Sequence, residues 1–170
     1  MTTCGWADRP HSDSSYLGVG DGSRPAMTFS GTAGGLQGRG LLQAAEAGAD
    51  EVCRILLAQR ADPNAGEGTS RRRPLLAAAG QGHAEVCELL LRKGACVSSG
   101  TSAGWTPLHA AAAAGHGRVC EVLLEKGADP YSKAQVGDHE ETPGDTARRR
   151  GHGVCADSLE ARARQRPIRP

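Results

Sequence analysis

Four of the six cysteines in this chain recur at a nearly constant interval, and each one follows a valine. Thiolates at regular positions could bind zinc or form disulfides, so metal coordination and cross-linking are the first chemistries to weigh. The dipeptides lie 34, 33 and 35 residues apart, at Val52-Cys53, Val86-Cys87, Val119-Cys120 and Val154-Cys155.

The interval itself argues against both chemistries. A period near 33 residues is typical of stacked helical repeats, in which equivalent residues lie one helix spacing of about 8–10 Å apart. A disulfide needs Cα atoms within about 7 Å, and the sulfurs around a zinc ion lie less than about 4 Å apart. We therefore expect no metal, no cofactor and no shared bond at these cysteines, and we assign them to the hydrophobic core.

The two remaining cysteines, Cys4 and Cys96, lie outside this register. Cys96 closely follows Gly94, a residue suited to ending a helix. We expect its thiol to be exposed and to be the most reactive one. Several unpaired thiols indicate a reducing compartment, so we expect the protein in the cytoplasm, the nucleus or both.

The sequence contains no recognisable set of catalytic residues. An enzyme needs a nucleophile, a base and an orienting group that converge on one pocket. The serines and acidic residues cluster in expected loops, and neither a G-x-S-x-G nor a G-x-x-x-x-G-K-[ST] motif occurs. We expect no enzymatic activity.

The bulk composition excludes several partners. The 170 residues carry a net charge of +1 and only 3% aromatic side chains. A net charge near zero gives no global field that attracts nucleic acid or anionic lipid. No apolar run approaches the roughly 18 residues of a membrane span, and no signal-like segment opens the chain. We expect neither a membrane nor a nucleic acid as the main partner.

The elements that position these residues are clearest around residues 104–129. Thr106 suits the N-cap of a helix, and Pro107 suits its first turn, where a missing N–H costs nothing. Gly115 ends this inner helix. An apolar stripe over residues 119–124 then predicts an outer helix, which Gly127 can end in a left-handed conformation.

Residues 106–111 read Thr-Pro-Leu-His-Ala-Ala, which resembles the Thr-Pro-Leu-His-x-Ala signature of ankyrin repeats. The resemblance implies an all-α solenoid of stacked helix-turn-helix units with hairpin-like loops. Atypical end repeats fit a capped stack. We expect a disordered tail at residues 1–38, a repeat domain at 39–163 and a basic tail at 164–170. The four repeats cover about residues 39–72, 73–105, 106–141 and 142–163.

The resemblance also implies roles for the histidines. In ankyrin repeats, residues at these positions are similar hydrogen-bonding links between loops and neighbouring turns. We expect this structural role for four histidines: His83, His109, His116 and His152.

Finally, the resemblance implies a binding surface made of loop fingers and an inner-helix palm. Trp105 is the only tryptophan within the repeats and fills a variable position just before the capping threonine, so we expect it to anchor a partner. Tyr131 is the second aromatic candidate. The other partner-binding residues that we predict are Arg71, Arg72, Gln81, Ala113, Ala114 and Arg149.

The leading prediction is a non-enzymatic, monomeric module that binds another protein, as an adaptor, a scaffold or a stoichiometric regulator. Two alternatives stay open. The arginines at 71–73 and the Arg-rich C-terminal part could bind phosphate or nucleic acid, with a steep salt dependence. The chain could also be the targeting domain of a truncated enzyme.

Overall fold

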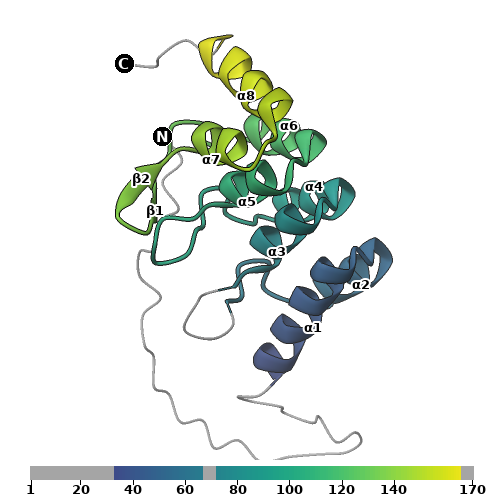
Figure 1. The fold of residues 1–170 in the computed structure, drawn as a ribbon. Helices are drawn as coiled ribbons and strands as arrows, with labels where there is room; N and C mark the ends of the chain where they lie inside the picture. Colours follow the sequence, from purple (N-terminus) through teal and green to yellow (C-terminus); the bar gives the residue numbers. More distant parts are fainter. Residues whose placement is uncertain (1–32, 67–71, 166–170) are drawn as a thin grey trace, which may run out of the picture.

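Each predicted repeat folds into an inner and an outer helix joined by a short turn. The computed structural model describes residues 33–66 and 72–165. The inner helices are α1 (Ala33–Ala47), α3 (Pro74–Gln81), α5 (Pro107–Ala114) and α7 (Pro143–Arg149). The outer helices are α2 (Asp50–Ala58), α4 (Ala84–Arg92), α6 (Gly117–Glu125) and α8 (Gly153–Gln165). The pairs stack in chain order (Figure 1), so the predicted all-α repeat solenoid is confirmed.

Small side chains let the inner helices pack closely. Ala78, Ala79, Ala111 and Ala112 are fully buried between neighbouring helices. A Cβ built on Gly80 would lie 3.8 Å from the Cβ of Ala110, which is ordinary van der Waals contact. The alanine runs of α3 and α5 therefore form the inner layer of the core.

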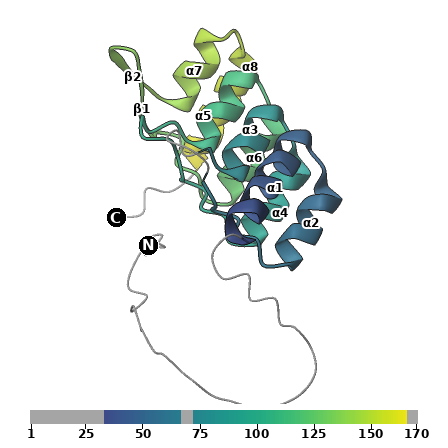
Figure 2. The ribbon, with the colours of Figure 1, turned by 90° about the horizontal axis from the view of Figure 1, so that it is seen from below.

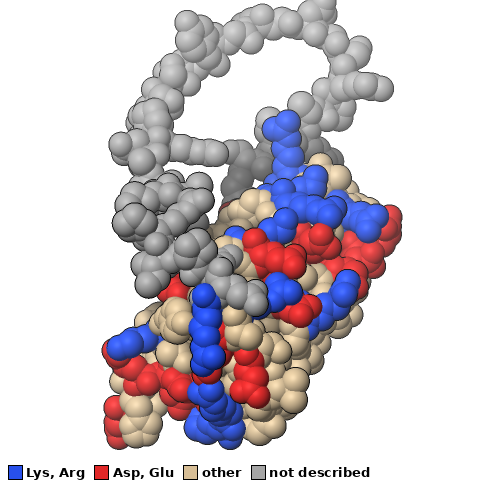
Figure 3. Space-filling view, turned by 90° about the horizontal axis from the view of Figure 1, so that it is seen from above, with Lys and Arg blue, Asp and Glu red and all other residues tan. Residues whose placement is uncertain are grey.

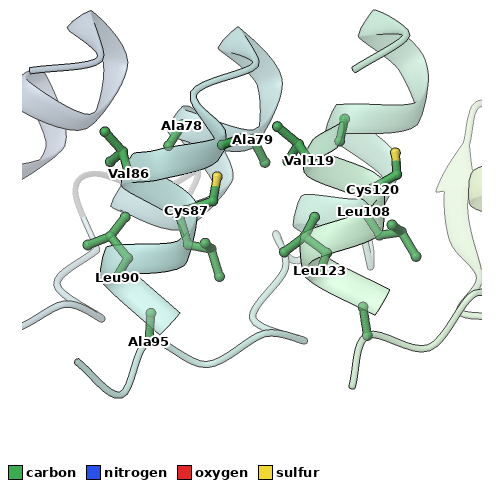
Figure 4. Packing of buried hydrophobic residues seen from close by; sticks show 14 of the residues in the cluster. Ala78, Ala79, Val86, Cys87, Leu90, Ala95, Leu108, Val119, Cys120 and Leu123 are labelled. Atoms are coloured by element: carbon green, nitrogen blue, oxygen red, sulfur yellow. The ribbon is translucent and has the colours of Figure 1, made fainter. Parts of the chain in front are cut away.

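The outer helices present different residues to their two neighbours. Figure 4 shows Val86 and Val119 on the side of their helices that faces the preceding repeat, with Cys87 and Cys120 on the side that faces the following one. All four side chains are buried. Each junction of the outer layer is thus built from the cysteine side of one helix and the valine side of the next.

The fourth outer helix departs from this register. In α8 the buried residues are Cys155, Ala156 and Leu159, whereas Val154 is 83% exposed. Cys155 lies four residues after Gly151, the same separation that Val119 has from its own glycine. Cys155 therefore occupies the valine position and faces α6, one residue out of step with the repeated Val-Cys dipeptide.

Histidines cover the turns between inner and outer helices. A Cβ on Gly48, whose φ is +71°, would lie 2.5 Å from the ring of His83, so the ring packs directly on this glycine. The His83 Nε2 also lies 3.1 Å from the carbonyl oxygen of Glu46. The expected link between turns is present at His83. The same packing joins Gly48 to His83, Gly82 to His116 and Gly115 to His152.

The loops project to one side of the stack, and the third is a hairpin of β1 (Ala134–Val136) and β2 (His139–Glu141) (Figures 1 and 2). The second and third loops touch through Gly104, where a Cβ would lie 2.7 Å from the carbonyl oxygen of Lys133. The Gln135 N–H also donates to the carbonyl oxygen of Ala103 at 2.8 Å. These contacts hold the fingers side by side.

Some expectations concern residues that the structure does not describe. Most of the predicted tail at 1–38, residue Arg71 and most of the tail at 164–170 lie outside the described ranges. Helix α1 begins at Ala33, so it includes the last residues that we had assigned to the tail. Across residues 33–66 and 72–165, no helix is long and apolar enough to cross a membrane.

Candidate protein-binding surface

Three residues hold equivalent positions where the fingers join the inner helices. Arg72, Trp105 and Glu141 each lie two residues before the proline that begins α3, α5 or α7. Their backbone follows the same course, because the residue after each one adopts an extended conformation and precedes the helix as its N-cap. These three side chains therefore form one row along the solenoid.

Trp105 packs against a histidine of the helix that follows it, α5. The indole and the imidazole of His109 have ring centroids 5.3 Å apart, with the planes tilted by 31°. The Trp105 carbonyl oxygen accepts a hydrogen bond from the Thr101 N–H at 3.0 Å, which fixes the backbone of the finger. The side chain is half-buried. Trp105 is thus in contact with His109 while part of its side chain remains exposed.

His109 is completely buried and belongs to a defined hydrogen-bond network. Its Nε2 lies 3.1 Å from the carbonyl oxygen of Glu141, so Nε2 must carry the proton because a carbonyl only accepts. Its Nδ1 then accepts from the Thr106 hydroxyl at 2.8 Å. Burial lowers the pKa of His109, and the hydrogen bond to the Glu141 carbonyl opposes this only in part. The imidazole is therefore neutral at pH 7.

Glu141 carries the charge at the third position of the row. Its side chain accepts from the Thr146 hydroxyl at 3.2 Å and pairs with Arg149 at 2.9 Å. Arg149, one of the predicted site residues, is thus engaged with Glu141 while half of its side chain stays exposed. We did not select Glu141 from the sequence. Its position two residues before Pro143, equivalent to that of Trp105, was the signal that could have identified it.

Arg72 makes the corresponding ion pair at the other end of the row. Its guanidinium lies 2.8 Å from a carboxylate oxygen of Glu46 on α1. Both side chains remain partly exposed, which limits the stability that the pair contributes to at most about 1 kcal/mol. The pair nevertheless places a predicted finger residue directly over the palm.

The palm between these two ion pairs is small and uncharged. Gln81 and Ala114 are exposed, and Gly80 and Ala113 are partly exposed. Trp105 holds the position in the chain that is equivalent to that of Arg72, which contacts Glu46 on the preceding inner helix. Gln81, Ala113 and Ala114 are thus at least partly accessible at the ends of α3 and α5, while Arg72 and Arg149 pair with Glu46 and Glu141.

Tyr131 lies apart from this row. It stands in the loop between α6 and β1, and its side chain is 61% exposed. Its backbone N–H donates to a carboxylate oxygen of Asp129 at 2.9 Å, which shapes the turn. The ring is available to a ligand, although it is less firmly supported than that of Trp105.

Several arginines in the described C-terminal part of the chain face carboxylates. Arg148 pairs with Asp145 and Glu160. Arg162 reaches Glu125 of α6 at 3.4 Å and Glu121 at 3.6 Å. Figure 3 shows basic and acidic side chains next to one another over this end of the molecule. Neighbouring carboxylates therefore offset much of the positive charge that the sequence suggested.

Two further observations concern the first and second fingers. Asn64 bridges them, because its amide donates to the Gly94 carbonyl oxygen at 3.0 Å and its Oδ1 accepts from the Cys96 N–H at 2.8 Å. Cys96 is disulfide-bonded. Our expectation of a reactive free thiol at this position is therefore wrong.

No metal site emerges among residues 33–66 and 72–165, where no three His, Cys, Asp or Glu side chains are grouped suitably for an ion. These residues form a stack of helix pairs in which Arg72, Trp105 and Glu141 hold equivalent positions. This arrangement defines a repeat solenoid of the kind that binds other proteins.

A family model described as ankyrin repeats, in three copies, matches residues 41–134. This match covers more than half of the chain, and the protein belongs to the ankyrin-repeat family. Ankyrin repeats are generally protein–protein interaction modules. The helix pair α7–α8 follows the matched segment and continues the stack. No curated protein matches the chain.

Proposed function

We propose that the protein is a non-enzymatic binding module that holds a partner protein on the palm beside Trp105. The observation that carries this proposal is the contact between Trp105 and the buried His109. Tryptophan side chains supply a large share of the binding energy in many interfaces. One that is already immobilised loses less conformational freedom on binding.

The chemistry of the surrounding palm supports an apolar anchor. Gly80 and Ala113 leave room above the inner helices and present no charge that a partner would have to desolvate. The pairs Arg72–Glu46 and Glu141–Arg149 flank this area. Partly exposed ion pairs favour the correct orientation and reject wrong partners more than they add affinity.

Binding of phosphate or nucleic acid through the arginines has less support. Such binding needs cations that are free to replace the counterions of phosphate groups. Arg72, Arg148, Arg149 and Arg162 each already face a carboxylate within 4.0 Å. No observation favours the alternative of a targeting domain from a truncated enzyme.

We further propose that the module acts as a monomer in the cytoplasm or the nucleus, as an adaptor, a scaffold or a stoichiometric regulator. Four of the five cysteines in the described part of the chain are free buried thiols, which suits a reducing compartment even though Cys96 is disulfide-bonded. Sedimentation analysis tests the monomer, and a fluorescent fusion tests the compartment.

Affinity capture tests the binding function. Wild type and Trp105→Ala are used as baits in parallel, with Val154→Ser as the matched control because Val154 is exposed on an outer helix. Proteins that the control retains and Trp105→Ala loses are partners of the proposed surface. Equal capture by all three baits would contradict the proposal.

A further inference from the structure

Cys120 and Cys155 meet across the junction between the third and fourth repeats. Cys120 lies on the side of α6 that faces the following repeat (Figure 4), and Cys155 occupies the position on α8 that faces the preceding one. At the junction before it, the equivalent partner of Cys87 is Val119. The register of α8 therefore creates a dithiol where the other repeats have a cysteine and a valine.

The contacts of Cys155 agree with this register. Its Sγ lies 3.7 Å from a Cβ built on Gly117, the residue one turn before Cys120 on the same face of α6. Burial raises the pKa of the Cys120 thiol and Cys155 raises it further, which requires the two thiols to lie close together. Both cysteines are free and buried. Our expectation that neighbouring repeats keep their cysteines too far apart to share chemistry is wrong at this junction.

The Cys155 thiol borders an opening in the surface beside this junction. Cys155 lines a hollow of about 290 Å³, and Cys120 does not. Glycines surround much of the opening, so few side chains obstruct a small reagent. The other lining residues are Gly115, Gly117, Gly151, His152, Gly153, Val154 and Ser158.

We propose that Cys155 and Cys120 form a redox modification site at which a peroxide closes a disulfide between the third and fourth repeats. The Cys155 sulfur attacks hydrogen peroxide, which oxidises it to a sulfenic acid and releases one water. The Cys120 sulfur then displaces the sulfenic oxygen, which leaves as a second water with the Cys120 proton. The two thiols lose two electrons in total, and the peroxide is reduced by two.

The two cysteines have distinct roles in this sequence. Burial raises the pKa of the Cys120 thiol, and the nearby Cys155 raises it further. Cys120 therefore stays protonated and reacts poorly with a free oxidant. It resolves the sulfenic acid because it is already in contact with Cys155. A dithiol reductant reverses the bond by thiol–disulfide exchange.

Peptide mapping tests the site on the full-length protein. The protein is treated with hydrogen peroxide, the remaining thiols are alkylated, and the product is digested with trypsin. Cleavage after Arg118, Lys126, Arg150 and Arg162 yields the peptides 119–126 and 151–162. We expect these two peptides to be joined, with a mass lower by two hydrogen atoms than their sum, and to separate on reduction.

Two variants provide the controls. Cys155→Val restores the residue type found at this position in the other outer helices, so its fold and circular dichroism should match wild type. We expect it to lose the cross-linked peptide completely, and Cys120→Ala to accumulate Cys155 sulfenic or sulfinic acid instead. The proposal is overturned if wild-type Cys155 is oxidised without joining Cys120, pairs with another cysteine, or remains unmodified.

Discussion

The Nε2 of His109 lies 3.1 Å from the carbonyl oxygen of Glu141, and this contact joins helix α5 to the end of strand β2. The same imidazole supports the indole of Trp105 from beneath. Glu141 in turn holds Arg149 on the palm. A single buried side chain thus supports both the proposed anchor and the ion pair beside it.

The burial of His109 predicts a pH-dependent stability. Its pKa is lowered on folding from 6.5, because burial disfavours the charged imidazole. Between the folded pKa and 6.5 the unfolded chain binds more protons, so the free energy of unfolding falls as the pH drops below 6.5. One proton limits the slope to about 1.4 kcal/mol per pH unit.

Urea unfolding at several pH values between about 5.5 and 7.5 measures this slope while most carboxylates remain ionised. We expect His109→Gln to be less stable at neutral pH and to show a flatter pH dependence. Parallel curves for the two proteins would contradict the assignment of the effect to His109.

The N-cap of α3 is a site of avoidable instability. Arg73 has φ −112° and ψ 152° and makes no capping hydrogen bond, whereas Thr106 has a similar backbone and caps α5. Arg73→Thr should therefore raise the free energy of unfolding by about 1 kcal/mol. Thr106→Ala should lower it by a similar amount. An unchanged or lower urea midpoint for Arg73→Thr would contradict this placement of the second repeat.

The glycines that follow α5 and α7 differ in what packs against them. Substituting each one with alanine therefore separates the cost of backbone strain from the cost of a steric clash. Gly115 and Gly151 have φ of +77° and +85°, but a Cβ on Gly115 would lie 2.6 Å from the His152 ring, whereas one on Gly151 meets nothing within 4 Å. Gly151→Ala should lose about 1 kcal/mol from its backbone conformation alone.

Gly115→Ala should lose more than Gly151→Ala, because the histidine ring must also move. Thermal unfolding of both variants measures the difference. Equal losses would show that the packing of His152 on Gly115 contributes little to the junction.

The sequence period and the signature at residues 106–111 were sufficient to predict the fold. Helices α3, α5 and α7 each begin at a proline, and threonines cap α5 and α7. The small alanines explain why neighbouring inner helices approach closely. Local chemistry and global packing agree in the middle repeats, which is the condition under which sequence patterns are most informative.

The register of the last helix was harder to predict. The letters Val154-Cys155 repeat an earlier dipeptide, but packing follows the distance from the preceding glycine, which is one residue shorter here. Glu141 was missed for a different reason. An acidic residue in a loop is normally solvated, and its burial depends on Arg149 and Thr146 of the following helix. The position of a residue within its repeat therefore predicts the burial of Cys155 and Glu141 more reliably than the residue type does.

The anchor is best isolated by variants that differ in size at one position. Trp105→Phe keeps a ring over His109, whereas Trp105→Ala removes it. We expect Trp105→Phe to retain the wild-type melting temperature and to weaken binding less than Trp105→Ala. If Trp105→Ala unfolds while Trp105→Phe stays folded, the ring is needed for packing, and Trp105 is then a structural residue rather than a binding anchor.

The most direct test is the dissociation constant of a captured partner for wild type, Trp105→Ala and Val154→Ser. If Trp105 is the anchor, Trp105→Ala should raise the dissociation constant by about 30-fold, which corresponds to roughly 2 kcal/mol. Val154→Ser should leave it unchanged, and wild-type binding should depend only weakly on salt. An unchanged dissociation constant for folded Trp105→Ala would contradict the proposed surface.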